Sequence, residues 1–187
     1  MSHELWRPEA VSYDSFVAHL ERAGWLPTYL PWPLRPGWSV VDFGVATGGA
    51  SHGTTAGATW TVVSGPSEID GPVDLLLVAE EAGVGLGSRF AGTPGADPGP
   101  GLGEGPPAAR IRIGSQLTSL WPVSISAAVG EWDRSVLAGE AAGRWLWLVV
   151  RPAAALLMLQ DGWELRDVSG LGPSLVELPF DGSHPRW

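Results

Sequence analysis

From Trp38 onward, the chain consists of short segments rich in β-branched and aromatic residues, and no amphipathic segment of helix length separates them. Parallel strands need a crossover of about a dozen residues, usually a helix, whereas antiparallel strands need only a turn. The sequence therefore predicts an α+β fold that is mostly antiparallel β, with one N-terminal helix packed on a twisted sheet. At 187 residues we expect a single domain over 1–187, with loose ends at 1–11 and 181–187.

Alternation and turn residues predict where the strands lie. The segments 38–46 and 58–65 flank a glycine-rich loop and are predicted to form a hairpin. Near Ala142-Gly143, a second hairpin is predicted. The strands of this second hairpin are expected at 133–141 and 144–150, and further strands are expected at 72–81 and 109–114.

The segment that ends at Gln160 has two interpretations. Asp161-Gly162 is a favoured two-residue turn, which predicts a hairpin between 156–160 and 163–168. The alternative is a helix over 153–160, because "AAALLML" consists largely of helix-forming residues. The sequence leaves both possibilities open.

The segment "SYDSFVAHLERAG" predicts the N-terminal helix. Ser12 is a suitable N-cap, Gly24 is placed for a C-cap, and Phe16 and Leu20 lie on one apolar stripe. We expect His19 of this helix to face solvent.

Composition excludes several chemistries. Cysteine is absent, so disulfides, thiolate nucleophiles and cysteine zinc sites are excluded. All eleven basic residues are arginine, which excludes a Schiff-base lysine and a phosphate-loop lysine. The four histidines lie far apart in the sequence, so we predict no metal site and no cofactor.

The charge balance bears on partners and compartment. A net charge of −9 argues against binding to nucleic acid or to an anionic membrane surface, which needs clustered positive charge. There is no long apolar run, and the N-terminus does not resemble a signal peptide. We therefore expect a cytoplasmic protein of bacterial type, whose oligomeric state the sequence leaves open.

The segment 83–107 contains nine glycines and five prolines, a density that predicts neither helix nor strand. Its glycine spacing fits neither the dinucleotide nor the Walker motif. We expect 84–100 to be a packed rim anchored by Arg89 and Phe90, and 101–107 to be a mobile loop.

Five residues are candidates for a ligand site: Glu80, Glu81, Arg89, Trp32 and Trp38. The leading hypothesis is a non-enzymatic domain that binds a small anionic ligand or another protein through tryptophans, of which the chain has eleven. The alternative is an enzyme acting on an anionic small molecule, with Glu80 or Glu81 as base and Arg89 as anion clamp. Arg89 also has a purely structural interpretation, as an ion-pair partner of either glutamate.

Four phrases, "LPWPLRPGW", "DLLLVAEEAGVGLGSRFAG", "DPGP" and "GEAAGRWLWLVVRP", resemble an uncharacterised protein family of high-GC Gram-positive bacteria. The resemblance spans roughly residues 25–168 and implies no activity. It implies that residues 80–100 belong to the domain and that 101–107 are a variable spacer. Relatives in that family often carry an N-terminal zinc ribbon, which this cysteine-free chain lacks.

Overall fold

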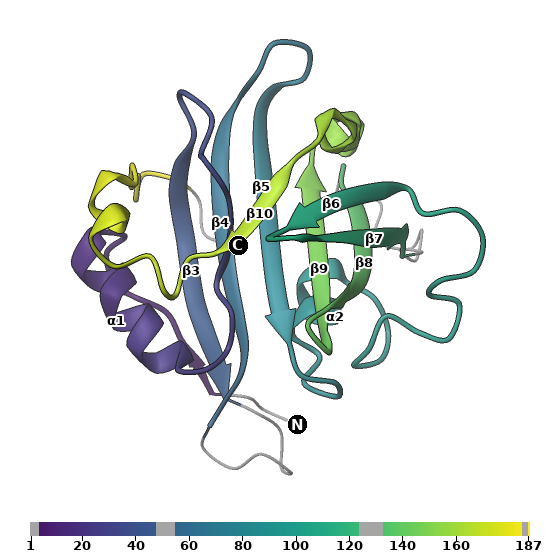
Figure 1. Cartoon of the computed structure of the whole chain (residues 1–187), viewed down its shortest axis with the longest axis horizontal. Coiled ribbons are helices and arrows are strands. Elements are labelled where there is room, and N and C mark those ends of the chain that lie inside the picture. Colours follow the sequence, from purple (N-terminus) through teal and green to yellow (C-terminus); the bar gives the residue numbers. More distant parts are fainter. Residues whose placement is uncertain (1–3, 48–54, 124–132, 185–186) are drawn as a thin grey trace.

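The computed structural model describes residues 4–47, 55–123, 133–184 and 187. Ten strands in this part of the chain form one sheet (Figure 1). In chain order the strands are β1 (Leu5–Trp6), β2 (Tyr29–Pro31), β3 (Ser39–Thr47), β4 (Ala56–Ser67), β5 (Gly71–Glu80), β6 (Ala109–Ile113), β7 (Gln116–Pro122), β8 (Ser135–Ala141), β9 (Arg144–Arg151) and β10 (Glu164–Asp167).

The strand order across the sheet is β1-β3-β4-β5-β9-β8-β7-β6-β10-β2. Within the described residues, every neighbouring pair is antiparallel except β6 and β10, which run parallel. The predicted α+β, mostly antiparallel fold is thus confirmed.

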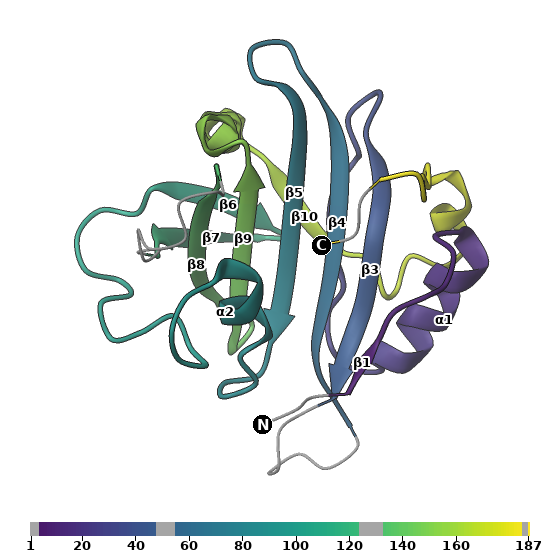
Figure 2. The same ribbon diagram turned by 180° about the vertical axis from the view of Figure 1, so that it is seen from behind.

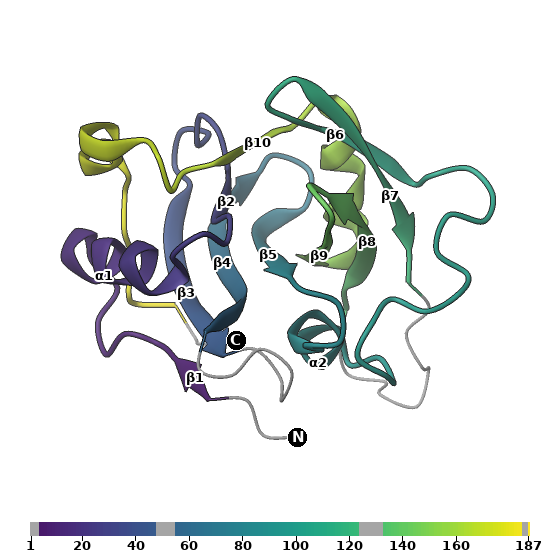
Figure 3. The same ribbon diagram turned by 60° about the horizontal axis from the view of Figure 1, so that its bottom comes forward.

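The sheet curls over, so that β10 and β2 at one of its ends lie across the strands β3, β4 and β5 of its other half. Figure 1 shows β10 crossing in front of β5, and Figure 3 shows β2 and β10 facing β3, β4 and β5 from the opposite side. Hydrogen bonds fix this contact: Thr59 Oγ1 donates to the carbonyl of Pro27 at 2.6 Å, and Thr61 Oγ1 to that of Tyr29 at 2.7 Å. The chain therefore has an enclosed inner face and an opposite outer face.

Side chains alternate between these two faces along each central strand, as a period of two requires. On β5, Leu75 and Leu77 belong to the inner core, whereas Leu76 and Val78 belong to the outer one. Trp147 of β9 also lies in the outer core. Both faces of the central strands are buried, so the outer face needs a cover of its own.

Two predicted hairpins are confirmed. β3 pairs with β4 across the glycine-rich connection, of which residues 48–54 lie outside the described residues. β8 pairs with β9 through Ala142 and Gly143, whose φ angles of 52° and 75° are the left-handed values that a two-residue hairpin turn needs.

The helix α1 (Tyr13–Ala23) forms where it was predicted and packs beside β3 (Figures 1 and 3). Ser12 caps it by accepting a hydrogen bond from the Ser15 N–H. The expectation that His19 faces solvent was wrong, because His19 is fully buried and its Nε2 bonds to Thr28 Oγ1 at 3.0 Å. Burial lowers its pKa from 6.5 to about 3, so this imidazole is neutral at physiological pH.

The hairpin predicted around Asp161-Gly162 was wrong, and the helical alternative is nearer the structure. Residues Ala153–Asp161 form a 3₁₀ helix, η1, which Gly162 ends with a φ of 75°. β10 follows, but it pairs with β2 and β6 instead of folding back on η1. Two distant strands supply its partners, and no local turn rule can foresee them.

The absence of helix predicted for the Gly/Pro-rich segment was also wrong, because it contains the short helix α2 (Leu86–Ala91). Figure 2 shows α2 lying over the outer face of β5 and β9. The Glu80 carboxylate accepts hydrogen bonds from the Leu86 and Gly87 N–H groups, which a helix start otherwise leaves unpaired. A Cβ on Gly87 would lie 2.2 Å from the Trp147 ring, so glycine permits the close approach of α2 to the sheet.

A second short 3₁₀ helix, η2 (Gly172–Glu177), precedes the C-terminal segment. Both ends of the chain contact β3, through β1 and through a bridge between Phe180 and Val40. Within 101–107, the Gly105 carbonyl accepts a hydrogen bond from the Trp121 indole at 3.1 Å. Looseness at 1–11 and 181–187, and mobility at 101–107, stay predictions.

Candidate functional site

Glu80 lies at the end of β5 on the outer face, beneath α2. Its side chain is 0% exposed, and its Oε2 accepts from Leu86 N at 2.7 Å and from Gly87 N at 3.1 Å. Burial raises the pKa of Glu80 to about 7, against the opposing effect of these two backbone hydrogen bonds. Glu80 therefore holds α2 in place and has no open path to a ligand in this arrangement.

Glu81 faces a different environment. Its Oε1 accepts a hydrogen bond from Arg144 Nε at 2.8 Å, and the Arg144 guanidinium lies 4.5 Å from the centre of the Trp25 ring. The partner of Glu81 is thus Arg144 of β9, and not Arg89 as the structural interpretation supposed.

Arg89 is exposed on α2 and anchors nothing in the rim. The rim is instead held by the buried Val84, Leu86 and Ala91, together with Phe90, whose ring lies 5.7 Å from that of Trp60. The three charged candidates therefore have separate surroundings, and they do not form the constellation that the enzyme hypothesis requires.

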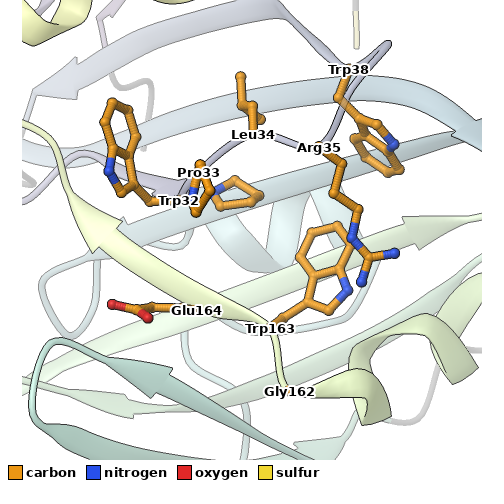
Figure 4. A pocket seen from close by; sticks show the side chains of 9 residues that line it. Trp32, Pro33, Leu34, Arg35, Trp38, Gly162, Trp163 and Glu164 are labelled. Atoms are coloured by element: carbon orange, nitrogen blue, oxygen red, sulfur yellow. The ribbon is translucent and has the colours of Figure 1, made fainter.

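The two tryptophan candidates line a pocket elsewhere, at the β2–β10 end of the sheet (Figure 4). Its volume is about 320 Å³, and it is lined by residues 31–35 with Trp38, and by 162–164. We call it the tryptophan pocket. The Trp32 N–H donates to the Glu164 carbonyl at 3.0 Å, so strand pairing joins its two segments.

Trp38 forms a fixed wall of the tryptophan pocket. Its indole N–H donates to the Pro66 carbonyl at 3.2 Å, and its ring packs edge-on against Trp163 with the centroids 5.6 Å apart. A Cβ on Gly65 would lie 2.3 Å from the Trp38 ring, so β4 leaves room for this indole only because residue 65 is glycine.

Trp163 brings an unpartnered hydrogen-bond donor to this pocket. The residue is only 6% exposed, yet its Nε1 has no hydrogen-bond partner among the described residues. The Arg35 guanidinium lies 4.7 Å from the centre of the same ring, and in Figure 4 the indole nitrogen is at the edge nearest that guanidinium. Two hydrogen-bond donors thus lie together, and a ligand acceptor would satisfy both.

Opposite charges lie on opposite sides of the tryptophan pocket. In Figure 4 the Arg35 guanidinium and the Glu164 carboxylate lie on either side of Trp163. Both side chains belong to exposed residues, and Trp32, near Glu164, is half-buried with the Arg166 guanidinium 5.9 Å from its ring centre. The pocket therefore combines an aromatic lining with a cation and an anion that a ligand can reach.

One known protein family matches almost the whole chain. The model of a family of unknown function, DUF6758, matches residues 4–187. The chain belongs to DUF6758. The predicted membership of an uncharacterised family is thereby confirmed, over a longer segment than 25–168. No curated protein and no solved structure matches the chain.

Three residues that line the tryptophan pocket were missed from the sequence: Arg35, Trp163 and Glu164. Trp163 and Glu164 stood in a predicted strand, but that strand was assigned to a local hairpin, which hid their approach to Trp38. Arg35 gave no signal beyond its proline-rich surroundings.

The described part of this DUF6758 chain contains no group of three or more histidine, aspartate or glutamate side chains placed to hold a metal ion. In the same residues, every helix is too short or too polar to span a membrane.

Proposed function

We propose that this DUF6758 protein is a non-enzymatic binding domain and that its ligand occupies the tryptophan pocket. The observation that carries the proposal is the buried Trp163 indole N–H, which lacks an acceptor beside an Arg35 guanidinium that makes no hydrogen bond or ion pair with the described residues. A buried donor without a partner costs about 1–3 kcal/mol, which a bound acceptor would recover.

The geometry defines the ligand by its chemistry. A carboxylate accepts from both the Trp163 N–H and the Arg35 fork, and a flat or prolyl body packs on the indoles. The volume of about 320 Å³ lies at the small end of the roughly 300–1,000 Å³ of ligand pockets. We therefore propose a small anionic molecule, or one carboxylate-bearing side chain or terminus of a partner protein.

The proposal extends to the setting of the protein. We propose that the protein acts in the cytoplasm of a high-GC Gram-positive bacterium, and that neither nucleic acid nor a membrane is its partner. The net charge of −9 supports the second part, because both surfaces repel an acidic protein. The zinc ribbon proposed for its relatives has no counterpart in this cysteine-free chain.

Calorimetric titration of a panel of small carboxylates with aromatic or prolyl bodies, each with its decarboxylated analogue, tests the proposal. We expect a carboxylate to bind, its analogue to bind at least about tenfold more weakly, and both Trp163→Phe and Arg35→Ala to cause a similar loss. Matched controls are Trp25→Phe, an exposed tryptophan outside the pocket, and Arg110→Ala, an exposed arginine on β6. Absence of any binding, or binding by both pocket variants that is as tight as that of the wild type, would refute the proposal.

A further inference from the structure

A second cavity lies on the outer face, lined in part by residues of α2. Figure 2 shows the position of α2 on this face. Its volume is about 500 Å³, and its apolar lining comes from Leu5, Trp60, Leu86, Phe90 and Trp187. At the roughly 30 Å³ that a water molecule occupies in the liquid, this volume corresponds to about seventeen non-hydrogen atoms. A body of that size and apolar character fits this lining.

The apolar wall is fixed before any ligand binds. Trp60 is only 1% exposed and packs against Phe90. Leu86 donates its N–H to Glu80, which holds α2 to the sheet. A preformed wall of this kind binds a ligand without first having to become ordered.

Three arginines complete the lining of this cavity, which we call the arginine pocket. They are Arg7, Arg89 and Arg134, and its lining includes no acidic residue among the described ones. Arg7 pairs with Asp42 at 2.9 Å beside the cavity, whereas Arg89 is exposed and makes no hydrogen bond or ion pair within the described residues. Arg89 therefore offers a cation that a bound anion can reach, in a protein whose net charge is −9.

Arg134 lies at the buried side of this cavity. Its side chain is buried, and it donates to the Ala91 carbonyl at the end of α2. Burial lowers the pKa of Arg134, and repulsion from the nearby Arg151 lowers it further. An anion bound beside Arg134 would favour its charged form.

We propose that the arginine pocket binds an amphiphilic carboxylate, with its acid group among Arg89, Arg134 and Arg7 and its apolar body against Trp60 and Phe90. The site is separate from the tryptophan pocket, so each proposal stands without the other. In this proposal Arg89 has the anion-binding role that was expected from the sequence, but neither Glu80 nor Glu81 takes part.

Decanoate is the probe, since its twelve non-hydrogen atoms fit the cavity, and decanol is its uncharged counterpart. In calorimetric titrations at pH 7.5, we expect decanoate to bind with one equivalent per chain and at least about tenfold more tightly than decanol. Arg89→Ala should weaken decanoate binding by about tenfold or more and leave thermal stability unchanged, because Arg89 is exposed. Phe90→Ala should weaken decanoate and decanol alike.

Arg110→Ala removes another exposed arginine, from β6, and should leave decanoate binding unchanged. Trp163→Phe should also leave it unchanged, which separates this site from the tryptophan pocket. Failure of decanoate to saturate the protein, equal affinity for decanol, or undiminished binding by Arg89→Ala would overturn the proposal.

Discussion

Replacing Glu80 by glutamine tests the central electrostatic claim about α2, namely that the protein buries a carboxyl group that prefers to be neutral. Glutamine keeps the shape of the protonated acid and can still accept the Leu86 and Gly87 N–H bonds. It cannot ionise, so the variant isolates the contribution of the Glu80 proton.

The magnitude follows from the raised pKa. Between the ordinary value of 4.5 and the folded value of about 7, the folded protein binds more protons than the unfolded chain. Stability therefore falls as pH rises through this window, by about 1.4 kcal/mol per pH unit, or about 3 kcal/mol in all. Below pH 4.5 this loss is absent, and above pH 7 it is complete.

Urea denaturation of wild type and Glu80→Gln at several values from pH 4 to 8 measures the effect. The difference between the two isolates Glu80, because the titration of His19 is common to both proteins. We expect the variant to gain about 3 kcal/mol relative to wild type from pH 4 to 8. Glu81→Gln, which breaks a partly exposed ion pair, should lower stability by at most about 1 kcal/mol at pH 7.

A difference between wild type and Glu80→Gln that does not change with pH would refute the reasoning, since it would show that Glu80 ionises normally. A change of the opposite sign would show that hydrogen bonds from α2 outweigh the cost of burying the carboxylate.

Three further outcomes are expected. Against His19→Phe, wild type should gain up to about 5 kcal/mol as pH rises from 3 to 6.5, because burial depresses the imidazole pKa, and paired denaturation curves measure this. Gly87→Ala should destabilise by about 1–3 kcal/mol through contact with Trp147, whereas Gly101→Ala, which meets no atom within 4 Å, should be neutral within about 0.5 kcal/mol in thermal unfolding. Ser12→Ala should cost about 1 kcal/mol in the same assay, and no change would mean that the capping hydrogen bond contributes nothing.

The central strands were predictable because their side chains alternate between two buried faces. On β5 the alternation alone places Glu80 on the same face as Leu76 and Val78, so its direction was available from the sequence. What the sequence could not show was the cover above it, since the N–H groups at the start of α2 are satisfied by the Glu80 carboxyl group and not by a local capping side chain.

The position of His19 in the sequence already indicated that its side chain is buried. It follows Phe16 by three residues and precedes Ala23 by four, which places it on the buried stripe of α1. Counting only apolar residues removed it from that stripe. Its partner Thr28 comes from the segment after α1, where nothing in the sequence marks a buried acceptor.

Only one of the two segments that form the tryptophan pocket could be predicted from the sequence. Trp32 and Trp38 were identified by their proline-rich surroundings, but Trp163 approaches them because β10 pairs with β2. Such a pairing depends on closure of the whole sheet and has no local sequence rule. The sequence thus indicated an aromatic surface, but not the hydrogen-bond donors that Trp163 and Arg35 add to it.

The pairing of β2 with β10 also determines when the tryptophan pocket can form during synthesis of the chain. During synthesis, residues 31–38 leave the ribosome long before 162–164 exist, and the contact must wait for nearly the whole chain. Closing so long a loop is entropically slow and is repaid only when both strands are present. A truncated or half-folded DUF6758 chain therefore has no tryptophan pocket, and the ligand binding that we propose there requires the completed fold.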